Sequence, residues 1–341
     1  ADDEVQTPGT GPVAVGALPF DPAADPSTPA EMVIPAAVLG RGRDGRTWVT
    51  RIHADPWTVS CDLERRRSHH GEPPEPFDVR AVVSRSEWAR AVATALEGIA
   101  EGKLKKVVLA RQVIVSADAE FSIATVVARL RRENPHCYVF AVDGLVGASP
   151  ELLVERRGEL VRSRPMAGTV PLGDEGALQW LATSRKDQWE HTLVVDAVVE
   201  RLALRCLDRP RVSRADVAAF AELAHFVTSV EGRLVPPPPS ALDLALELHP
   251  TPAVAGEPTA SALELISRLE PRRRGRYGGP VGWVDAHGDG EFAVALRCAQ
   301  VHANQAVLYA GAGIVAGSTS EAEWQETEVK LEPMLRALAR R

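Results

Sequence analysis

The chain has 341 residues, of which 45% are hydrophobic and 25% charged, a balance typical of a globular protein and not of a disordered one. Its 39 Lys and Arg residues against 46 Asp and Glu residues give a net charge of -7, which argues against a nucleic-acid binder with a broad basic surface. No apolar run approaches the ~18 residues of a membrane helix, and four cysteines without C-x-x-C spacing suggest neither a disulfide framework nor a zinc site. We therefore expect a cytoplasmic protein with no nucleic-acid partner and no membrane partner.

The chain up to about residue 80 is predicted to be less regular than the rest. Residues 1–31 are rich in Pro, Gly, Asp and Ala around one apolar island at 13–20, which predicts an irregular arm with a single strand. Residues 68–78 and 236–239 have the composition of connectors. We expect one domain over residues 1–341, with a core at 84–341 that carries all the motifs described below.

Residues 84–164 contain clear signals for one helix and several strands. Ser84 and Glu87 form a capping box before apolar residues at helical spacing, which predicts a helix over 84–102. The run at 103–115 is unbroken and β-branched, so it predicts a strand. Turn signals at 143–144 and 157–158 separate short strand-like runs at 138–142, 145–148, 152–156 and 159–164. These strands are expected to pair in antiparallel fashion.

Helical patterns dominate the second half of the chain. Helices are predicted at 185–207, 214–224, 259–269 and from 321 to the end, and strands at 291–302 and 306–310. Because strands and helices come in blocks and not in strict alternation, the predicted fold class is α+β, with antiparallel β-sheets packed as a sandwich and helices outside.

Two of these helix starts carry a matched pair of acids. Asp187 and Glu190 follow Ser184 at three and six residues, and Glu323 and Glu326 follow a second Ser in the same way. At this spacing the two acids share one helix face, so two such helix ends could together hold Mg²⁺. Asp187 and Glu323 can equally serve as capping residues, whereas Glu190 and Glu326 lie one turn further in.

Five other side chains could serve a site, and each also has an ordinary structural explanation. Lys330 can form a surface ion pair four residues after an acid. Arg297, among alanines on one face of its strand, can hold a carboxylate or pair with a helix acid. Lys106 on an apolar strand face could act as a base, but local reasoning favours an amine that reaches solvent from the strand start. Glu151 could be a general acid, although a Glu after Ser-Pro is ordinarily a solvated turn residue, and His225 is more often a core histidine.

A glycine-rich stretch at 309–318 joins a predicted strand to the last helix. Gly311 and Gly313 belong to it, and their backbone N–H groups could hold the oxygens of an anion. Tight turns explain these glycines equally well. The stretch does not have the G-x-G-x-x-G spacing of a dinucleotide site.

Nine motifs in order carry a resemblance to a known family. They occupy residues 106–111, 147–153, 164–169, 186–191, 248–256, 276–279, 295–297, 311–315 and 323–330, and residues 13–21 add a weaker one. Together they resemble the chorismate-utilising enzymes, the family of anthranilate synthase component I, aminodeoxychorismate synthase, salicylate synthase and isochorismate synthase. The resemblance covers about residues 103–338.

This resemblance implies a fold and a set of site residues. It implies a single domain of antiparallel sheets with Mg²⁺ holding one carboxylate of chorismate. Glu190, Glu323 and Glu326 resemble the metal-binding acids, while Asp187 departs from the Glu of some relatives. The implied substrate-binding residues are Gly168, Thr169, Ala253, Tyr277, Arg297, Gly311, Gly313 and Lys330. His225 resembles an active-site histidine that contacts the reacting side of the ring.

Single positions favour one branch of this family. Isochorismate formation adds water at C2 and expels the C4 hydroxyl, and Lys106 and Glu151 resemble the required base and acid. Anthranilate synthases usually carry Gln in place of Lys106, aminodeoxychorismate synthases a Lys in place of Ala167, and salicylate synthases a hydroxyl-bearing residue in place of Ala253. The expected activity is that of an isochorismate synthase acting as a monomer without a glutamine amidotransferase subunit. The alternatives are salicylate synthesis, or a catalytically silent chorismate or anion binder.

Overall fold

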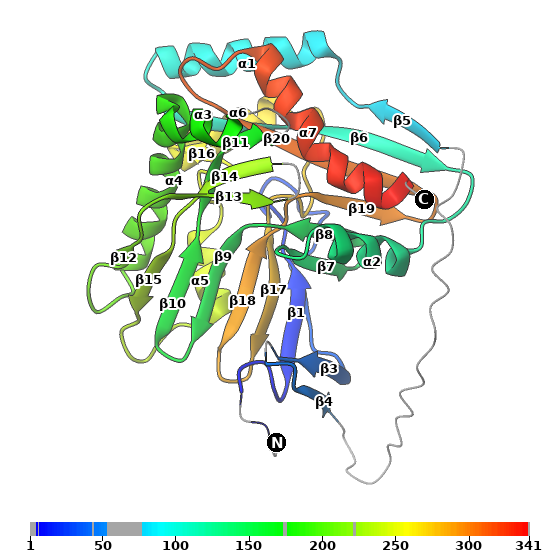
Figure 1. Cartoon of the computed structure of the whole chain (residues 1–341), viewed down its shortest axis with the longest axis vertical. Coiled ribbons are helices and arrows are strands. Elements are labelled where there is room, and N and C mark those ends of the chain that lie inside the picture. Colours follow the sequence, from blue (N-terminus) through cyan, green and yellow to red (C-terminus); the bar gives the residue numbers. More distant parts are fainter. Residues whose placement is uncertain are drawn as a thin grey trace.

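A computed structural model describes residues 5, 7–42, 44–52, 77–172, 176–220 and 223–339. These residues form an α+β fold of antiparallel sheets with helices on the outside (Figure 1), as predicted. The expected connector at 68–78 lies outside the described residues, except for its last two, which begin a strand.

The largest sheet has eight strands and stands in the lower half of Figure 1. In spatial order its strands are β12 (Arg211–Val212), β15 (Val230–Arg233), β10 (Leu160–Arg164), β9 (Leu152–Arg157), β18 (Gly290–Val294), β17 (Pro280–Asp285), β1 (Val13–Ala17) and β2 (Met32–Val33). The expected N-terminal strand is β1, and it pairs with β17 from far along the chain. The N-terminal arm is thereby fixed to the main sheet.

A second sheet of seven strands runs across the upper half of the molecule. Its strands are, in order, β16 (Gly256–Glu257), β6 (Lys106–Ala117), β20 (Gln305–Ile314), β19 (Cys298–His302), β8 (Leu145–Ser149) and β7 (Tyr138–Val142), with β5 (Phe77–Ala81) also pairing with β6. A three-stranded sheet contains β11 (Met166–Pro171), β14 (Leu223–Val227) and β13 (Asp216–Phe220), and β3 (Ala37–Arg41) and β4 (Thr47–Arg51) form a separate hairpin.

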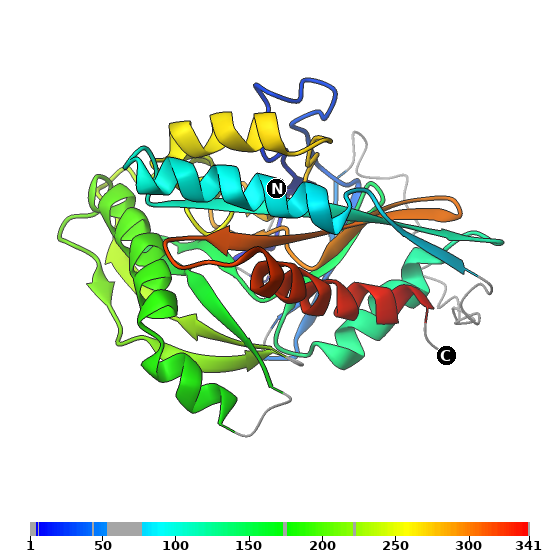
Figure 2. The ribbon, with the colours of Figure 1, turned by 90° about the horizontal axis from the view of Figure 1, so that it is seen from above.

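Helices cover the outer faces of the sheets. They are α1 (Arg85–Ala100), α2 (Ile123–Glu133), α3 (Ala177–Thr183), α4 (Arg185–Ala203), α5 (Ala241–Leu248), α6 (Thr259–Leu269) and α7 (Ser320–Ala339). In Figure 2, α1 and α7 lie side by side over β6 and β20, which they contact. Because β6 has helices and other strands around it, nearly all of its residues are buried. None of the helices in the described ranges is long and apolar enough to cross a membrane.

The helix predicted at 214–224 is wrong, because these residues form most of the β13–β14 hairpin. Ala218 of β13 pairs with His225 of β14, and His225 pairs in turn with Thr169 of β11. The alanines here would suit a helix, but every described side chain of β14 is buried in this sheet. Tertiary pairing therefore outweighs local helix propensity.

The single strand predicted at 291–302 is also wrong, since the structure divides it into β18 and β19. β18 pairs with β9 and β17 of the eight-stranded sheet, whereas β19 pairs with β8 and β20 of the seven-stranded sheet. Arg297 lies at the crossing with φ of +48°, so the strict alternation that placed it on the face of Ala293 and Ala299 does not continue. The next strand extends to Ile314, which places Gly311 and Gly313 inside β20 and not in a loop.

Candidate active site

A cavity of about 570 Å³, partly open to solvent, lies between strands of the seven-stranded and three-stranded sheets and the connections β8–β9 and β18–β19. It is lined by Lys106, Val108, Pro150, Glu151, Met166, Ala167, Gly168, Thr169, Glu190, His225, Ala253, Val254, Tyr277, Leu296, Arg297, Gly311, Gly313 and Lys330. The lining contains every residue predicted as catalytic or substrate-binding, together with Glu190. Lys106 and Lys330, 224 positions apart in the sequence, therefore line the same cavity.

Lys106, the first residue of β6, has no exposed surface. The expectation of a solvent-facing amine is wrong, because β6 pairs with β16 on one side and β20 on the other, and the exposed lysines are Lys103 and Lys105 instead. The Nζ atom lies 2.9 Å from Glu190 Oε1. Beyond this ion pair it has no hydrogen-bond partner among the described residues. The amine is thus held at the cavity with room for a ligand contact.

Glu151 lies in the turn between β8 and β9, yet it is only 3% exposed. The expectation of a solvated turn residue is wrong here, since its backbone is held by Val294, whose N–H donates to the Glu151 carbonyl. Burial raises the pKa of the Glu151 carboxyl to about 8, against an opposing effect of the nearby Lys106. The carboxyl therefore keeps its proton at neutral pH and can donate it to a leaving group.

His225 links the three-stranded sheet to Arg297. Its Nδ1 lies 3.1 Å from both the Gly168 carbonyl and Thr169 Oγ1, and because a carbonyl only accepts, we assign the ring proton to Nδ1. Nε2 is then free to accept from Arg297 Nη2, 3.3 Å away. Burial and the positive charge of Arg297 hold the pKa of His225 well below its ordinary value. The ring is neutral and orients the guanidinium at the cavity.

The acids of α4 and α7 gather around a lysine that was not predicted as a site residue. Lys186 Nζ lies 2.7 Å from Glu323 Oε1, and although burial alone would lower the pKa of Lys186, Glu323, Glu190 and Glu326 together raise it. Burial and the neighbouring Glu326 raise the pKa of Glu323. Lys186 stands beside Asp187 in the sequence, but no pattern near it indicates an ion pair with Glu323 of α7.

Each of the three acids is paired with a different lysine. Glu190 pairs with Lys106, Glu323 with Lys186, and Glu326 with Lys330 at 2.5 Å. Burial would raise the pKa of Glu190, but Lys106 and the other lysines lower it. Asp187 instead lies in the first turn of α4, where its N–H donates to Oγ of the capping residue Ser184 and its carboxylate accepts from the Ser184 hydroxyl.

The donor chemistry of these acids fits a divalent cation. Carboxylate oxygens on two helix ends are the ligands that Mg²⁺ takes, and the amine held among Glu190, Glu323 and Glu326 shows that this place stabilises positive charge. Within the residues that the structure describes, no three such side chains stand together in ligating positions. Each of the three carboxylates is instead paired with a lysine.

Two glycines leave space for this arrangement. A Cβ on Gly313 would stand 2.2 Å from Glu190 Oε1 and 3.0 Å from Lys106 Cε, so a side chain there would displace the ion pair. Gly168 has φ of +70° at a bulge in β11, a conformation that favours glycine. These glycines thus permit close packing around the cavity.

Lys330 and Tyr277 complete the wall around Gly311. Lys330 Nζ donates to the Gly311 carbonyl at 2.9 Å, in addition to its ion pair with Glu326. The Lys330 side chain is largely buried, so this ion pair is not one of the ordinary kind on an exposed helix face. A Cβ on Gly311 would stand 3.0 Å from Tyr277 Oη. Tyr277 is buried and stacks on Tyr309 with ring centroids 5.1 Å apart. Val108, Met166 and Leu296 also line the cavity; they lie within the ordered motifs at 106–111, 164–169 and 295–297 but were not predicted as site residues.

Comparison with known families agrees with this geometry. A family model described as "Chorismate binding enzyme" matches residues 1–339. The chain belongs to this family. The resemblance inferred from the ordered motifs is thereby confirmed.

Other chorismate-binding enzymes are similar to this one over nearly its whole length. The isochorismate synthase EntC of Escherichia coli is 36% identical over 95% of this chain and 80% of the relative, and isochorismate synthase DhbC of Bacillus subtilis is 35% identical over 96% and 81%. The solved structure of MenF, the menaquinone-specific isochorismate synthase of Escherichia coli, superposes with a TM-score of 0.81 at 28% identity, covering 96% of this chain and 78% of that one.

Proposed function

We propose that the protein is an isochorismate synthase, an isomerase that converts chorismate to isochorismate by adding water at C2 and releasing the C4 hydroxyl. The observation that carries this proposal is the buried Glu151, whose pKa of about 8 keeps it protonated beside the buried amine of Lys106. The identity to two curated isochorismate synthases supports it.

The reaction needs one group that donates a proton and a second group that accepts one. Glu151 delivers its proton to the departing C4 hydroxyl, which leaves as water, and Lys106, once it has released the proton of the ammonium that pairs with Glu190, takes a proton from the water that attacks C2. The proton count closes, because the enzyme gives one proton and receives one. Arg297, held by neutral His225, is placed to bind a carboxylate of the substrate with its guanidinium.

We propose further that Mg²⁺ binds to Glu190, Glu323 and Glu326. The ion would neutralise a substrate carboxylate and fix it at this end of the cavity. Glu190 both lines the cavity and contacts Lys106, so the residues that would hold the metal adjoin the residues that move protons. Metal binding requires Lys186 to leave its place beside Glu323.

The direct test is to incubate the protein with chorismate, with and without Mg²⁺, and to separate the products by chromatography. We expect isochorismate alone, formed only with Mg²⁺, and no anthranilate when ammonium is added. Salicylate with pyruvate would overturn the proposal in favour of salicylate synthesis, despite Ala253 in the cavity wall. Binding of chorismate without any product would identify a silent binder.

Two variants test the assigned roles. Lys106→Gln and Glu151→Gln each remove one proton-transfer group while keeping a similar shape, so each should lower kcat by roughly 10²- to 10⁴-fold. Lys103→Gln is the matched control, because Lys103 is exposed and its amine pairs with the surface residue Glu101. Wild-type turnover in both test variants would contradict the roles, even with isochorismate as product.

Three expectations about the setting of the enzyme belong to the same proposal. We propose a cytoplasmic monomer that works without a glutamine amidotransferase subunit. Free thiols at Cys137, Cys206 and Cys298 support a reducing compartment. The use of water and not ammonia as nucleophile removes the need for an ammonia-supplying partner.

A further inference from the structure

The strand that begins with Lys106 has a gap along one edge. On that edge β16 pairs with Lys106 and Val107, and β5 pairs with residues 113–117. Between them the Val108 N–H donates to the Ala255 carbonyl and the Val82 N–H donates to the Gln112 carbonyl, but in the part of the chain that the structure describes no strand pairs with residues 109–111 on this edge, although the other edge pairs continuously with β20. Buried backbone groups in such a gap need other hydrogen-bond partners.

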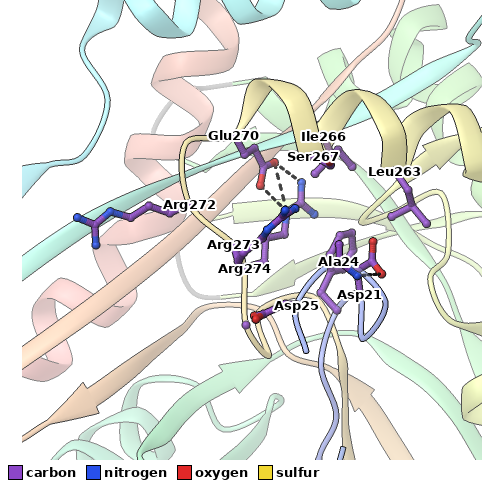
Figure 3. Close-up of a pocket in the computed structure, with 12 residues that line it drawn as sticks. Asp21, Ala24, Asp25, Leu263, Ile266, Ser267, Glu270, Arg272, Arg273 and Arg274 are labelled. Carbon is purple, nitrogen blue, oxygen red and sulfur yellow. Dashed lines mark hydrogen bonds and ion pairs between the residues drawn. The ribbon is translucent and has the colours of Figure 1, made fainter. Parts of the chain in front are cut away.

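Two side chains after α6 fill this gap. Glu270 Oε1 accepts from the Ala110 N–H at 2.8 Å, and Arg274 Nη2 donates to the Val108 carbonyl at 2.8 Å. The two side chains pair with each other at 2.5 Å and are 8% and 3% exposed. Figure 3 shows Arg274 turned toward Glu270, whereas the neighbouring Arg272 points away. The pair thus takes the place of a missing stretch of strand.

Arg274 also holds two other parts of the cavity wall. Its Nη1 donates to the Val254 carbonyl at 2.7 Å, beside Ala253. Its guanidinium lies over the rings of Phe20, at 4.3 Å, and Tyr277, at 5.9 Å. One guanidinium therefore connects β6, the 253–254 segment and Tyr277, each of which contributes lining residues to the cavity.

We propose that Glu270 and Arg274 are positioning residues that set the wall of the active site. Neither lines the active-site cavity, so they act through Lys106, Ala253 and Tyr277. The expected loss of turnover rests on the proposed function, whereas the expected loss of chorismate binding rests on the geometry alone. A displacement of about 1 Å of a reacting group can cost roughly 100-fold in rate, so loss of the pair lowers both turnover and affinity.

The test separates positioning from simple stabilisation. Arg274→Met leaves the carboxylate of Glu270 buried without its cation, so it should lower both stability and activity. Adding Glu270→Gln removes that charge and keeps an acceptor for the Ala110 N–H, so part of the lost stability should return, while the Val108 and Val254 carbonyls stay without their donor. If the pair positions the wall, the double variant stays at least 10-fold below wild type in kcat/KM and in calorimetric affinity for chorismate, with a melting temperature clearly above that of Arg274→Met. Arg205→Met, in the exposed Arg205–Glu247 pair, is the control and should match wild type.

Activity and affinity that recover together with stability in the double variant would overturn the proposal. So would failure of the double variant to fold, because the pair would then be required for the sheet itself. Absence of isochorismate with the wild-type protein would instead refute the proposed function. The affinity comparison would still decide the positioning role in that case.

Discussion

Glu151 shows how burial alone can give a carboxyl group its chemical role. Its pKa of about 8 lies above the ordinary 4.5 because the side chain is desolvated, so the protonated form that donates to the leaving group declines as pH rises past 8. We predict that kcat/KM for isochorismate formation falls on the alkaline side with an apparent pKa near 8. A pH–rate profile with Mg²⁺ held constant measures this, and a flat profile from pH 7 to 9 would contradict the acid role.

The same residue should make folding stability depend on pH. The folded protein retains a proton on Glu151 that the unfolded chain releases above about pH 4.5, so the contribution of this group to stability falls as pH rises from 4.5 to 8. One unit of pKa corresponds to about 1.4 kcal/mol. Glu151→Gln should therefore gain stability over wild type between pH 6 and 8 while losing activity, as measured by denaturant unfolding. Lys103→Gln should show the same dependence of the unfolding free energy on pH as wild type. If the unfolding free energy of Glu151→Gln changed with pH in parallel to that of wild type, the raised pKa of Glu151 would be contradicted.

At the residue scale, the sequence identified the site residues but not their surroundings. Lys106 and Glu151 were recognised by ordered motifs, while local reasoning favoured a solvent-facing amine and a solvated turn. Both are buried because strands distant in sequence close over them. Lys186 was missed because its partner Glu323 lies 137 residues away on another helix. A local pattern cannot contain such a contact.

At the element scale, β20 must come close to α4 for the site to form. Gly313 permits this, since a Cβ there would stand 2.2 Å from Glu190 Oε1. We predict that Gly313→Ala lowers kcat/KM by roughly 10- to 100-fold through displacement of the Glu190–Lys106 pair. Gly98→Ala in α1 is the matched control, because its Cβ meets only Leu104 at 3.5 Å and Ala favours the helix by about 1 kcal/mol. Steady-state kinetics and thermal unfolding of both variants measure this, and unchanged kinetics in Gly313→Ala would contradict it.

Elements with strong local signals could be predicted, and those defined by tertiary pairing could not. The capping box at Ser84 and Glu87 correctly marked the start of α1, and the turn at 143–144 correctly separated β7 from β8. The β13–β14 hairpin was mistaken for a helix, because its pairing with β11 is not visible locally. The division of residues 291–302 into β18 and β19 at Arg297 was missed for a similar reason. The run is apolar throughout, so nothing in it indicates where the chain passes from one sheet to the other.

At the scale of the whole molecule, the cavity joins the sheets. β6 and β20 belong to one sheet, β11 and β14 to another, and Arg297 lies where the chain passes from β18 to β19. A ligand in the cavity therefore touches strands of two sheets and the connections β8–β9 and β18–β19 that lead into the eight-stranded sheet. Its binding energy should stabilise the described core as one unit and not one sheet alone.

This arrangement predicts how ligands change thermal unfolding. With chorismate and Mg²⁺ each at about 100 times Kd, linkage gives about 2.7 kcal/mol per ligand, which should raise the Tm by several degrees in a single cooperative transition. Glu190→Gln should lose most of the increase caused by Mg²⁺, because it removes one of the proposed ligands and the partner of Lys106. Glu101→Gln, at an exposed surface pair, should keep the full increase. Differential scanning calorimetry measures this increase. Two unfolding transitions, only one of which moves to higher temperature with ligand, would contradict the prediction that the core unfolds as one unit.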